Sequence, residues 1–359
     1  MRRNSFIPSL LRHVLVPVLL FLPFTGSAQI GGSQAFDFLN LVTSARIGAV
    51  GGYFSAVTND DDLSLAIDNP SLLHADMEKR LVFDYVNYFS DINFGSCAYA
   101  HHLPGWGTLS AGMRYVDYGS FQETNEQGDV VGSFRASDMA FQLGTARAID
   151  SNFTAGVNAR FIYSSLAGYT SSGVAADLAV TYRKPQGRFA AALLLRNVGV
   201  QVNPYVDQTR EKLPYEVQIA ISQKLEHLPF RYIVHFTQLQ KLDLNYENSN
   251  NPTLLVDPLT GESIEPRKMI GDKIMRHVVL GGELSPSQNF HIRFGYNYRR
   301  RQELKVDSRA GTVGFSWGFG LKISKFQLNY GRATYHLAGA SNHFSVSTRI
   351  SDFIKKEEN

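Results

Sequence analysis

Three consecutive acidic residues, Asp60, Asp61 and Asp62, are the first candidates for chemistry in this chain. Carboxylate oxygens bind hard cations such as Ca²⁺, so the run is a candidate cation site. An exposed acidic turn is the commoner arrangement, because like charges repel one another and favour contact with water. The sequence leaves both interpretations open.

The remaining reactive side chains are poorly grouped. His101 and His102 are adjacent, and neighbouring residues of a β-strand point to opposite faces, which disfavours joint chelation of a metal. Cys97 is the only cysteine, so the chain has no intramolecular disulfide. The sequence lacks a phosphate-binding glycine loop, a zinc-type spacing and a nucleophile elbow. We therefore expect a non-enzymatic protein without catalytic residues, metal or cofactor.

The elements that carry these residues are predicted to be β-strands, because apolar and polar residues alternate in most of the chain. In the clearest example, Phe153 to Tyr163, apolar side chains occupy one phase, Asn158 and Arg160 occupy the other, and only Ile162 departs. Inside a bilayer, strands must close into a barrel so that each backbone polar group has a partner. The pattern therefore predicts an all-β fold, a transmembrane barrel with apolar residues facing lipid and polar residues facing a lumen.

Fourteen antiparallel strands are expected within residues 81–353, and single-chain bacterial barrels have an even number. The predicted strands are 81–90, 92–103, 107–118, 136–149, 152–165, 172–183, 187–198, 215–226, 229–239, 276–285, 288–300, 311–323, 325–333 and 342–353. Tight turns alternate with longer segments at 119–135, 166–171, 199–214, 240–275, 301–310 and 334–341. Outer-membrane barrels place short turns in the periplasm and long loops outside, so this alternation orients the chain.

A soluble β-sandwich or lipocalin-like barrel is the alternative, since its strands also alternate. About fourteen strands would leave a lumen too wide for side chains alone to fill, which disfavours a soluble barrel. After the N-terminus no apolar run reaches about 18 residues, which excludes transmembrane helices. The aromatic content of 12% suits a barrel with aromatic residues at both membrane interfaces.

Residues 1–28 are predicted to be a secretory signal peptide. Three arginines accompany an apolar core at 14–24, and Gly26-Ser27-Ala28 supplies small residues at a cleavage site. A single membrane helix is the alternative, but the core is short for spanning a bilayer. The formal charge of +3 comes from this segment, because removing its three arginines leaves 32 basic against 32 acidic residues. A basic nucleic-acid-binding surface is therefore not expected.

Residues 29–80 lack the strand alternation and are predicted to form a hatch inside the lumen, which would otherwise leak. Glycines there allow close packing or positive φ, and the Asn-Pro step can start a short helix. Plug architecture alone explains these residues, and a hatch that moves to admit a lipid is the functional alternative. The predicted hatch residues are Gly48, Gly51, Gly52, Asp60, Asp61, Asp62, Asn69 and Pro70.

Short motifs follow one another in this region: Ser44-Ala45-Arg46, Gly51-Gly52, the acidic run and Asn69-Pro70-Ser71, with Ala338 to Phe344 near the C-terminus. Their order resembles the FadL-like class of 14-stranded fatty-acid transporters. It is most similar to the PorV/PorQ branch, which serves the Bacteroidetes type IX secretion system. The resemblance extends over the whole mature chain.

The resemblance implies a non-enzymatic component of the attachment complex in the outer membrane of a Gram-negative, Bacteroidetes-like cell. In that family, a sortase links exported cargo to lipopolysaccharide, and a PorQ-like barrel anchors a PorZ-like surface protein. The implied partners are that surface protein, indirectly the sortase and a PorV-like barrel, and lipopolysaccharide. Two alternatives are a FadL-like transporter of hydrophobic small molecules, which needs an apolar pocket and a lateral gap, and a diffusion porin, which a plug disfavours.

The long segment 240–275 is the predicted partner-binding loop, because structureless loops of this length are usually functional or disordered. Its candidate residues are Asn245, Tyr246, Glu247, Glu262, Glu265, Arg267, Lys268 and Asp272. Arg299, Arg300 and Arg301 are candidates for lipopolysaccharide phosphates, which guanidinium groups bind bidentately, with a solvated strand end as the alternative. Phe353 is expected to close the last strand, ahead of a charged periplasmic tail at 354–359.

Overall fold

The computed structural model describes residues 34–57, 60–90, 92–184, 187–206, 209–244, 255–256, 263–264, 270–304, 311–336 and 339–354. The predicted signal peptide lies outside these residues, as does the tail beyond Ile354.

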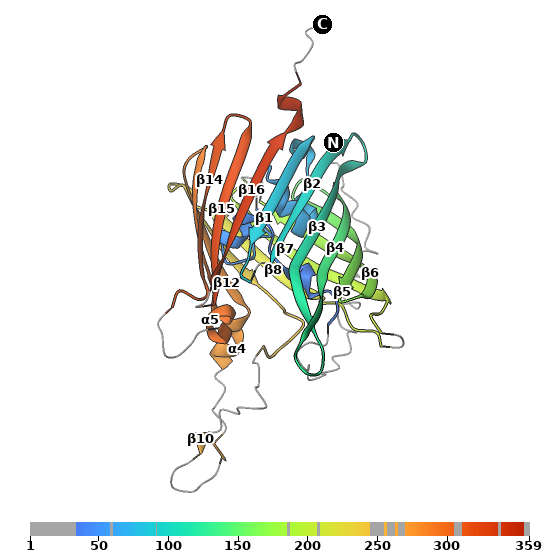
Figure 1. The fold of residues 1–359 in the computed structure, drawn as a ribbon. Coiled ribbons are helices and arrows are strands. Elements are labelled where there is room, and N and C mark those ends of the chain that lie inside the picture. Colours follow the sequence, from blue (N-terminus) through green and yellow to red (C-terminus); the bar gives the residue numbers. More distant parts are fainter. Residues whose placement is uncertain are drawn as a thin grey trace, which may run out of the picture. The chain divides into compact units, whose positions relative to one another are not determined.

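The described chain forms a closed barrel of fourteen antiparallel strands (Figure 1), which confirms the predicted fold class. The first strand pairs with both the second and the last, and this double pairing closes the ring. Each of the fourteen predicted ranges overlaps one of these strands. The strands are β1 (Arg80–Asn87), β2 (Asn93–Leu103), β3 (Gly107–Thr124), β4 (Val130–Ala148), β5 (Phe153–Leu166), β6 (Tyr169–Arg183), β7 (Phe189–Asn203), β8 (Glu216–Lys224), β9 (Phe230–Phe236), β12 (Val278–Ser287), β13 (Phe290–Asn297), β14 (Phe315–Ile323), β15 (Phe326–His336) and β16 (Gly339–Arg349).

The two faces of the wall differ as the alternation predicts. Phe161 and Leu178 point outward and are 51% and 52% exposed, whereas Arg160 and Asp177 point inward and are buried. Ile162 breaks the sequence pattern because it faces inward and packs in an apolar cluster with plug residues. An apolar exterior around a polar interior is the arrangement of a membrane-spanning barrel.

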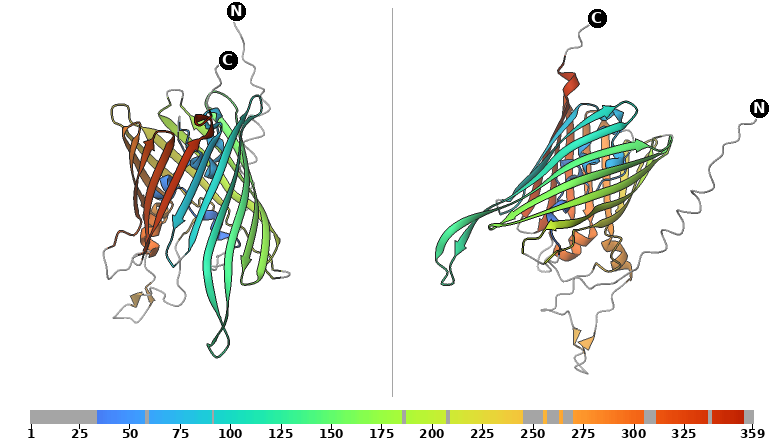
Figure 2. Two further views of the ribbon diagram at one scale, coloured as in Figure 1. Left: turned by 45° about the horizontal axis from the view of Figure 1, so that its top comes forward. Right: turned by 90° about the vertical axis from the view of Figure 1, so that its right-hand side faces the viewer.

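The described residues of 34–79, which we call the plug, lie inside the barrel, and their helices appear in blue in Figures 1 and 2. The plug begins beside the β7–β8 connector, where Gln34 forms a parallel β-bridge with Lys212, and ends at Arg80, the first residue of β1. None of the helices in the described part of the chain is long and apolar enough to cross a membrane. The plug helices are η1 (Asp37–Asn40), α2 (Ala45–Ala49), α3 (Leu63–Asp68), η2 (Pro70–Leu72) and η3 (Ala75–Met77).

Side-chain caps start the main plug helices. The Ser44 hydroxyl accepts from the Ile47 amide at α2, and the Asp62 carboxylate accepts from the Ser64 amide at α3. The Asn69 side chain likewise caps η2, which has Pro70 at its first position, as the Asn-Pro step predicts. These short helices therefore begin where the local sequence supplies an acceptor.

Wall glycines let α2 approach the barrel closely. A Cβ at Gly331 would lie 2.3 Å from the Ala45 carbonyl oxygen, and one at Gly295 would lie 2.1 Å from the Gly51 nitrogen. Both distances are too short for any side chain, so these inward positions require glycine. Gly51 itself has φ of 96°, a conformation that glycine adopts without strain.

Several predicted boundaries are wrong. Segment 119–135 is mostly strand, because β3 and β4 stay paired with each other beyond the rest of the wall. Segment 166–171 and the described residues of segment 334–341 are also mostly strand. The predicted strand 288–300 ends at Asn297, whose side chain accepts from the Arg300 amide and so starts a helix.

Two further elements differ from expectation at the loops and the C-terminus. The helix that follows Asn297 is α5 (Tyr298–Leu304). A second helix, α4 (Ile270–Arg276), lies within the predicted partner loop, as do the two-residue strands β10 (Leu255–Val256) and β11 (Ser263–Ile264). The last strand ends at Arg349, which pairs with the first residue of β1, so no partner strand continues beyond it. Phe353 therefore lies outside β16, where its ring packs 5.6 Å from that of Phe326.

Leu178 faces outward near the middle of β6. Leu178→Arg should destabilise the barrel by roughly 2–4 kcal/mol in a bilayer, because a cation near the midplane loses its hydration. Val202→Arg, near the end of β7, is the matched control and should cost roughly 0–1 kcal/mol. Urea unfolding in phosphatidylcholine vesicles measures both. Equal effects, or a chain that stays dissolved without detergent, would contradict a lipid-facing wall.

Candidate functional site

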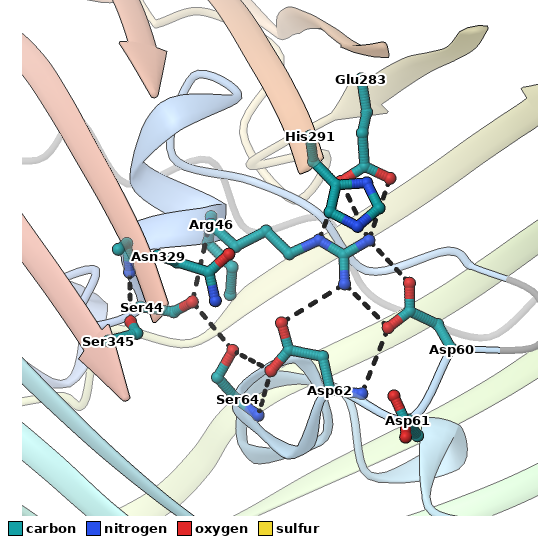
Figure 3. A network of polar contacts seen from close by, with 12 residues as sticks. Ser44, Arg46, Asp60, Asp61, Asp62, Ser64, Glu283, His291, Asn329 and Ser345 are labelled. Carbon is teal, nitrogen blue, oxygen red and sulfur yellow. Dashed lines mark hydrogen bonds and ion pairs between the residues drawn. The ribbon is translucent and has the colours of Figure 1, made fainter. Parts of the chain in front are cut away.

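The Arg46 guanidinium, on α2, lies at the centre of a buried ion-pair network between plug and wall (Figure 3). Its Nε and one Nη donate to Glu283 of β12, both at 3.0 Å. Its two Nη atoms donate to Asp60 at 2.8 and 2.6 Å, and one of them donates to Asp62 at 3.3 Å. All five N–H groups of the guanidinium are therefore used by three carboxylates.

Two wall arginines complete the network. Arg293 of β13 donates to Glu283 at 2.7 Å and to Asn329 at 2.8 Å. Arg231 of β9 lies 3.9 Å from Asp60 and from Glu283. The network therefore contains three guanidinium groups and three carboxylates. They belong to Arg46, Arg231 and Arg293, and to Asp60, Asp62 and Glu283. Their charges balance in a region shielded from water.

Local hydrogen bonds hold the plug side of this network in place. Asp62 accepts from the Ser64 hydroxyl at 2.7 Å, and the Ser64 and Ser44 hydroxyls are 2.9 Å apart. Ser345 of β16 accepts from the Ala45 amide at 2.9 Å (Figure 3). The starts of α2 and α3 are therefore fixed to each other and to the wall.

The ion pair perturbs the titration of Asp60. Burial alone raises the pKa of this carboxyl, but the Arg46 guanidinium outweighs burial and lowers the pKa to about 2. The carboxylate is therefore ionised across the physiological pH range, and its contact with Arg46 persists there.

The other end of α3 is held by the opposite wall. Asp68 accepts from Arg196 of β7 at 2.9 Å and from Arg114 of β3 at 3.3 Å. The carbonyl oxygen of Ile67 accepts from wall side chains of β4 and β5, including Arg160 at 3.5 Å. The inward-facing charges are thus buried against the plug and are not exposed in an open lumen.

A third contact set lies where the plug joins β1. Asp61 pairs with Arg80, and Arg349 of β16 lies 3.7 Å from the same carboxylate. The cations that meet the acidic run are therefore arginine side chains. The exposed-turn interpretation is wrong for Asp60 and Asp62, whose side chains are 16% and 2% exposed. In the described part of the chain, no three potential metal ligands lie together.

The other predicted hatch residues also contact the wall. A Cβ at Gly48 would lie 3.1 Å from the His343 ring. Gly52 has φ of 94°, and the Asn69 amide donates to the Ser55 carbonyl at 2.6 Å and to Thr181 of β6 at 3.2 Å. The predicted hatch residues in the described chain are therefore mainly packing and hydrogen-bonding positions.

A polar seam joins β1, β2 and β16 to the plug. Asp84 of β1 accepts from the Ser345 hydroxyl at 2.5 Å and from the Ser96 hydroxyl of β2 at 2.8 Å. Ser96 also lies 2.9 Å from the Thr43 hydroxyl. The wall junction and the plug therefore share the same hydroxyl groups.

The residues predicted to bind partners are only partly described. Asp272 lies in α4, accepts from the Tyr298 hydroxyl at 2.8 Å and pairs with Arg276 at 2.7 Å. Partial burial raises the pKa of Asp272, but hydrogen bonds from Arg276 and Tyr298 together outweigh burial and lower the pKa. The remaining seven predicted positions, Asn245, Tyr246, Glu247, Glu262, Glu265, Arg267 and Lys268, lie outside the described residues.

The predicted lipopolysaccharide residues lie in α5 and not at a strand end. The Arg300 guanidinium stacks 4.0 Å from the Tyr335 ring centre, and Arg301 donates to the Gly311 carbonyl at 2.5 Å. Arg299 lies 3.9 Å from Glu303, one turn further along the helix. Two of the three arginines therefore make contacts within the barrel mouth.

The histidine pair and the cysteine are dispersed, as expected from strand geometry. His101 lies 3.1 Å from Glu78, whereas His102 lies 3.0 Å from Thr108. Cys97 is a free, partly exposed cysteine of β2.

A groove opens in the wall where β7 and β8 separate. Pairing of these strands stops at Arg196 and Glu216, although β7 continues to Asn203. The chain before β8 turns inward, because the Ala35 amide donates to Lys212 and the Asn197 amide donates to Pro214. The groove has a volume of about 470 Å³ and is lined by Leu195, Asn197, Val198, Gly199, Val200, Gln201, Arg210, Glu211, Lys212, Leu213 and Tyr215.

The space between plug and wall beside Leu39 and Arg160 is much smaller. That cavity has a volume of about 10 Å³, close to the minimum needed for one water molecule. In the described part of the chain, the plug and the β3–β5 wall are therefore in close contact.

Sequence reasoning did not assign Arg46 and Glu283 to the network, although Arg46 is part of a quoted motif. The available signal was the excess of charged residues in the lumen phase, since buried charges require partners. Identifying the partners needs the register between strands, which the sequence does not specify.

No protein-family model matches this sequence, and no curated protein matches it significantly. Among solved structures, the chain is similar to the Pseudomonas putida toluene transporter TodX, with 12% identity, coverage of 85% of this chain and 96% of that chain, and a TM-score of 0.47. It is also similar to a Pseudomonas aeruginosa FadL homologue, with 10% identity, coverage of 85% and 97%, and a TM-score of 0.45. A third is the CymD monoaromatic hydrocarbon channel, with 11% identity, coverage of 87% and 97%, and a TM-score of 0.48.

These similarities are too distant to support an argument about function. The class follows from the molecule itself: fourteen strands in a closed antiparallel ring, an apolar outer face and an internal plug held by buried ion pairs. It is a plugged β-barrel of the membrane-spanning type.

Arg46→Met should leave three carboxylates without their central cation. We expect a loss of roughly 3–5 kcal/mol in the free energy of unfolding, because removing one partner of a buried ion pair leaves uncompensated charge. Arg188→Met, which removes an exposed pair 2.6 Å from Glu226, is the matched control and should cost roughly 0–1 kcal/mol. Urea unfolding and trypsin cleavage of the plug measure the change. Equal stability of the two variants would contradict the conclusion that the Arg46 network holds the plug in place.

Asp60→Asn should destabilise the wild type by on the order of 2 kcal/mol at neutral pH. The folded pKa of about 2 lies below the usual value of 3.8, so the stabilisation is fully present above about pH 4. It is lost as the pH falls through about 2, and the difference between the two proteins should close there. Urea midpoints measured between pH 2 and 7 test this, and a pH-independent difference would contradict it.

Proposed function

We propose that this protein is a non-enzymatic outer-membrane barrel that anchors a surface protein, as a PorQ-like component of the type IX secretion attachment complex. The observation that carries the proposal is that buried ion pairs hold the plug inside the barrel. Arg46, Asp61 and Asp68 each join the plug to a different part of the wall. A barrel stoppered in this way suits a rigid support better than a conduit.

The exterior supports placement in a membrane. Apolar and aromatic side chains such as Phe161, Leu178 and Trp317 are about half exposed on the outer face of the strands. Such a surface is costly in water but stable in lipid. The outer membrane is proposed because closed barrels of membrane-spanning β-strands are characteristic of that membrane.

The end of the barrel that carries α4, α5 and the β3–β4 tip is the proposed extracellular side (Figure 1). Here the barrel would meet a PorZ-like surface protein, with the sortase and a PorV-like barrel as indirect partners. Lipopolysaccharide contact is proposed for Arg299, since the neighbouring arginines already make contacts within the barrel mouth.

A FadL-like transporter of hydrophobic small molecules is the second candidate function. The observation that favours it is the lateral groove between β7 and β8, whose volume of about 470 Å³ falls in the range of ligand sites. Val198 and Val200 give the groove an apolar, outward-facing side. Transport through the bore would require the plug to move away from its arginine partners.

Two disulfides can test whether the plug must move. The hydroxyl oxygens of Thr43 and Ser96 are 2.9 Å apart, and those of Ser71 and Thr181 are 2.6 Å apart, so paired cysteines should be able to bridge plug and wall. Each pair would be introduced with Cys97→Ser, which removes the native thiol. Binding of the purified PorZ-like protein to nanodisc-embedded barrel, and oleate uptake by intact cells, would be compared before and after reduction.

For an anchor, the oxidised variants should bind the surface protein as tightly as the reduced ones, within about twofold. The single-cysteine variants serve as controls for the substitutions themselves. Absence of binding by the wild type, together with oleate uptake that oxidation stops and dithiothreitol restores, would reject the anchor and favour the transporter.

A further inference from the structure

The hairpin of β3 and β4 extends beyond the barrel wall as a free two-stranded ribbon, residues 118–135 (Figure 2). On one side, β3 last pairs with β2 at Asp117 and Asn93. On the other side, β4 first pairs with β5 at Ala136 and Leu166. Both outer edges of the ribbon are therefore without a partner strand in the described chain, over residues 118–124 of β3 and 130–135 of β4, or roughly 20 Å each.

The ribbon carries apolar side chains without a core to cover them. The rings of Phe121 and Phe134 stack at 5.3 Å across the two strands, and Phe121 is 43% exposed. Val130 and Val131 are 59% and 61% exposed. A lone two-stranded hairpin is only marginally stable in water, so a ribbon of this length gains from an added surface.

The edges lack two of the residue types that commonly protect an exposed strand from strand addition. Native proteins commonly place lysine or proline on exposed edges, and residues 118–135 contain neither. Irregularities interrupt the pairing between Asp117 and Ser120 at the base of the ribbon and between Glu123 and Thr124 near its tip, and Ser120 to Glu123 pair regularly with β4 between them. The regular stretch between these irregularities can therefore accept another strand through its backbone groups.

The charge of the ribbon restricts what can bind. Glu123, Glu126 and Asp129 are exposed near the tip, and Arg135 at the base is the only basic residue of the ribbon. Anionic lipid headgroups would be repelled by this tip, and so would a second copy of the same ribbon. A protein surface with basic residues is the complementary occupant.

We propose that the ribbon 118–135 is the docking arm for the surface protein, which adds an edge strand to the ribbon and places basic residues against its acidic tip. This inference rests on the proposed anchoring function and names the element that performs it. In the complex, the surface protein would cover the apolar face formed by Phe121 and Phe134, which no other part of the described chain covers.

The test uses full-length barrel in nanodiscs and the purified PorZ-like surface protein as the probe. One variant reverses the tip charges, with Glu123→Lys, Glu126→Lys and Asp129→Lys. A second replaces residues 119–135 with Asn-Gly, which closes the hairpin near the rim. The matched control reverses three exposed acids at the opposite end, Asp76, Asp150 and Asp352. Heat-modifiable migration confirms that each barrel is folded.

Both ribbon variants should bind at least about tenfold more weakly than the wild type, whereas the control should bind equally. Wild-type binding should weaken with added salt, and amide hydrogen exchange in 118–135 should slow in the complex. If the wild type binds but the ribbon variants bind equally well, or ribbon exchange is unchanged, the docking arm is refuted. If the wild type does not bind at all, the anchoring function is itself refuted.

Discussion

Burying a guanidinium costs free energy unless counter-charges pair with it, and this constraint determines how the plug sits in the barrel. Arg46 meets it with two carboxylates from its own segment and one from the wall. The wall carboxylate is in turn held by Arg293, so the network continues around the ring. Losing any member would leave a charge without water or counter-charge, which is more costly than losing an exposed pair. The plug therefore stays in the barrel because removing it would leave buried charges unpaired, as well as because the ion pairs attract one another.

The wall and the plug depend on each other through side-chain size as well as charge. Glycines of β13 and β15 leave room for α2, and the inward isoleucine of β5 fills space beside the start of the plug. An apolar plug would lie against the same arginines and leave them unpaired. This mutual dependence explains why many inward-facing strand residues are charged, and why those next to α2 are small.

Strand number and facing could be predicted from the sequence because alternation with period two follows directly from strand geometry. Ile162 shows the limit of that reasoning: it breaks the pattern because of a contact with residues more than a hundred positions away. The acidic run shows a second limit. Its counter-charges come from Arg46, Arg80 and Arg231, which lie on different elements, and local sequence contains no information on such distances. The helix at Tyr298 could not be predicted because the Asn297 cap acts where β13 ends its pairing with β12, and the position of that end depends on the neighbouring strand.

Ser345 accepts from the plug at Ala45 and donates to the first strand at Asp84. The junction that seals the cylinder is thus completed by atoms of the segment it encloses. Since the plug runs directly into β1, which pairs with β16, we expect the plug to enter the barrel together with closure of the wall. In a barrel closed without the plug, Ser345 and Asp84 would face water and the Ala45 contact would be absent, so we expect the wall to close around a plug that is already in place.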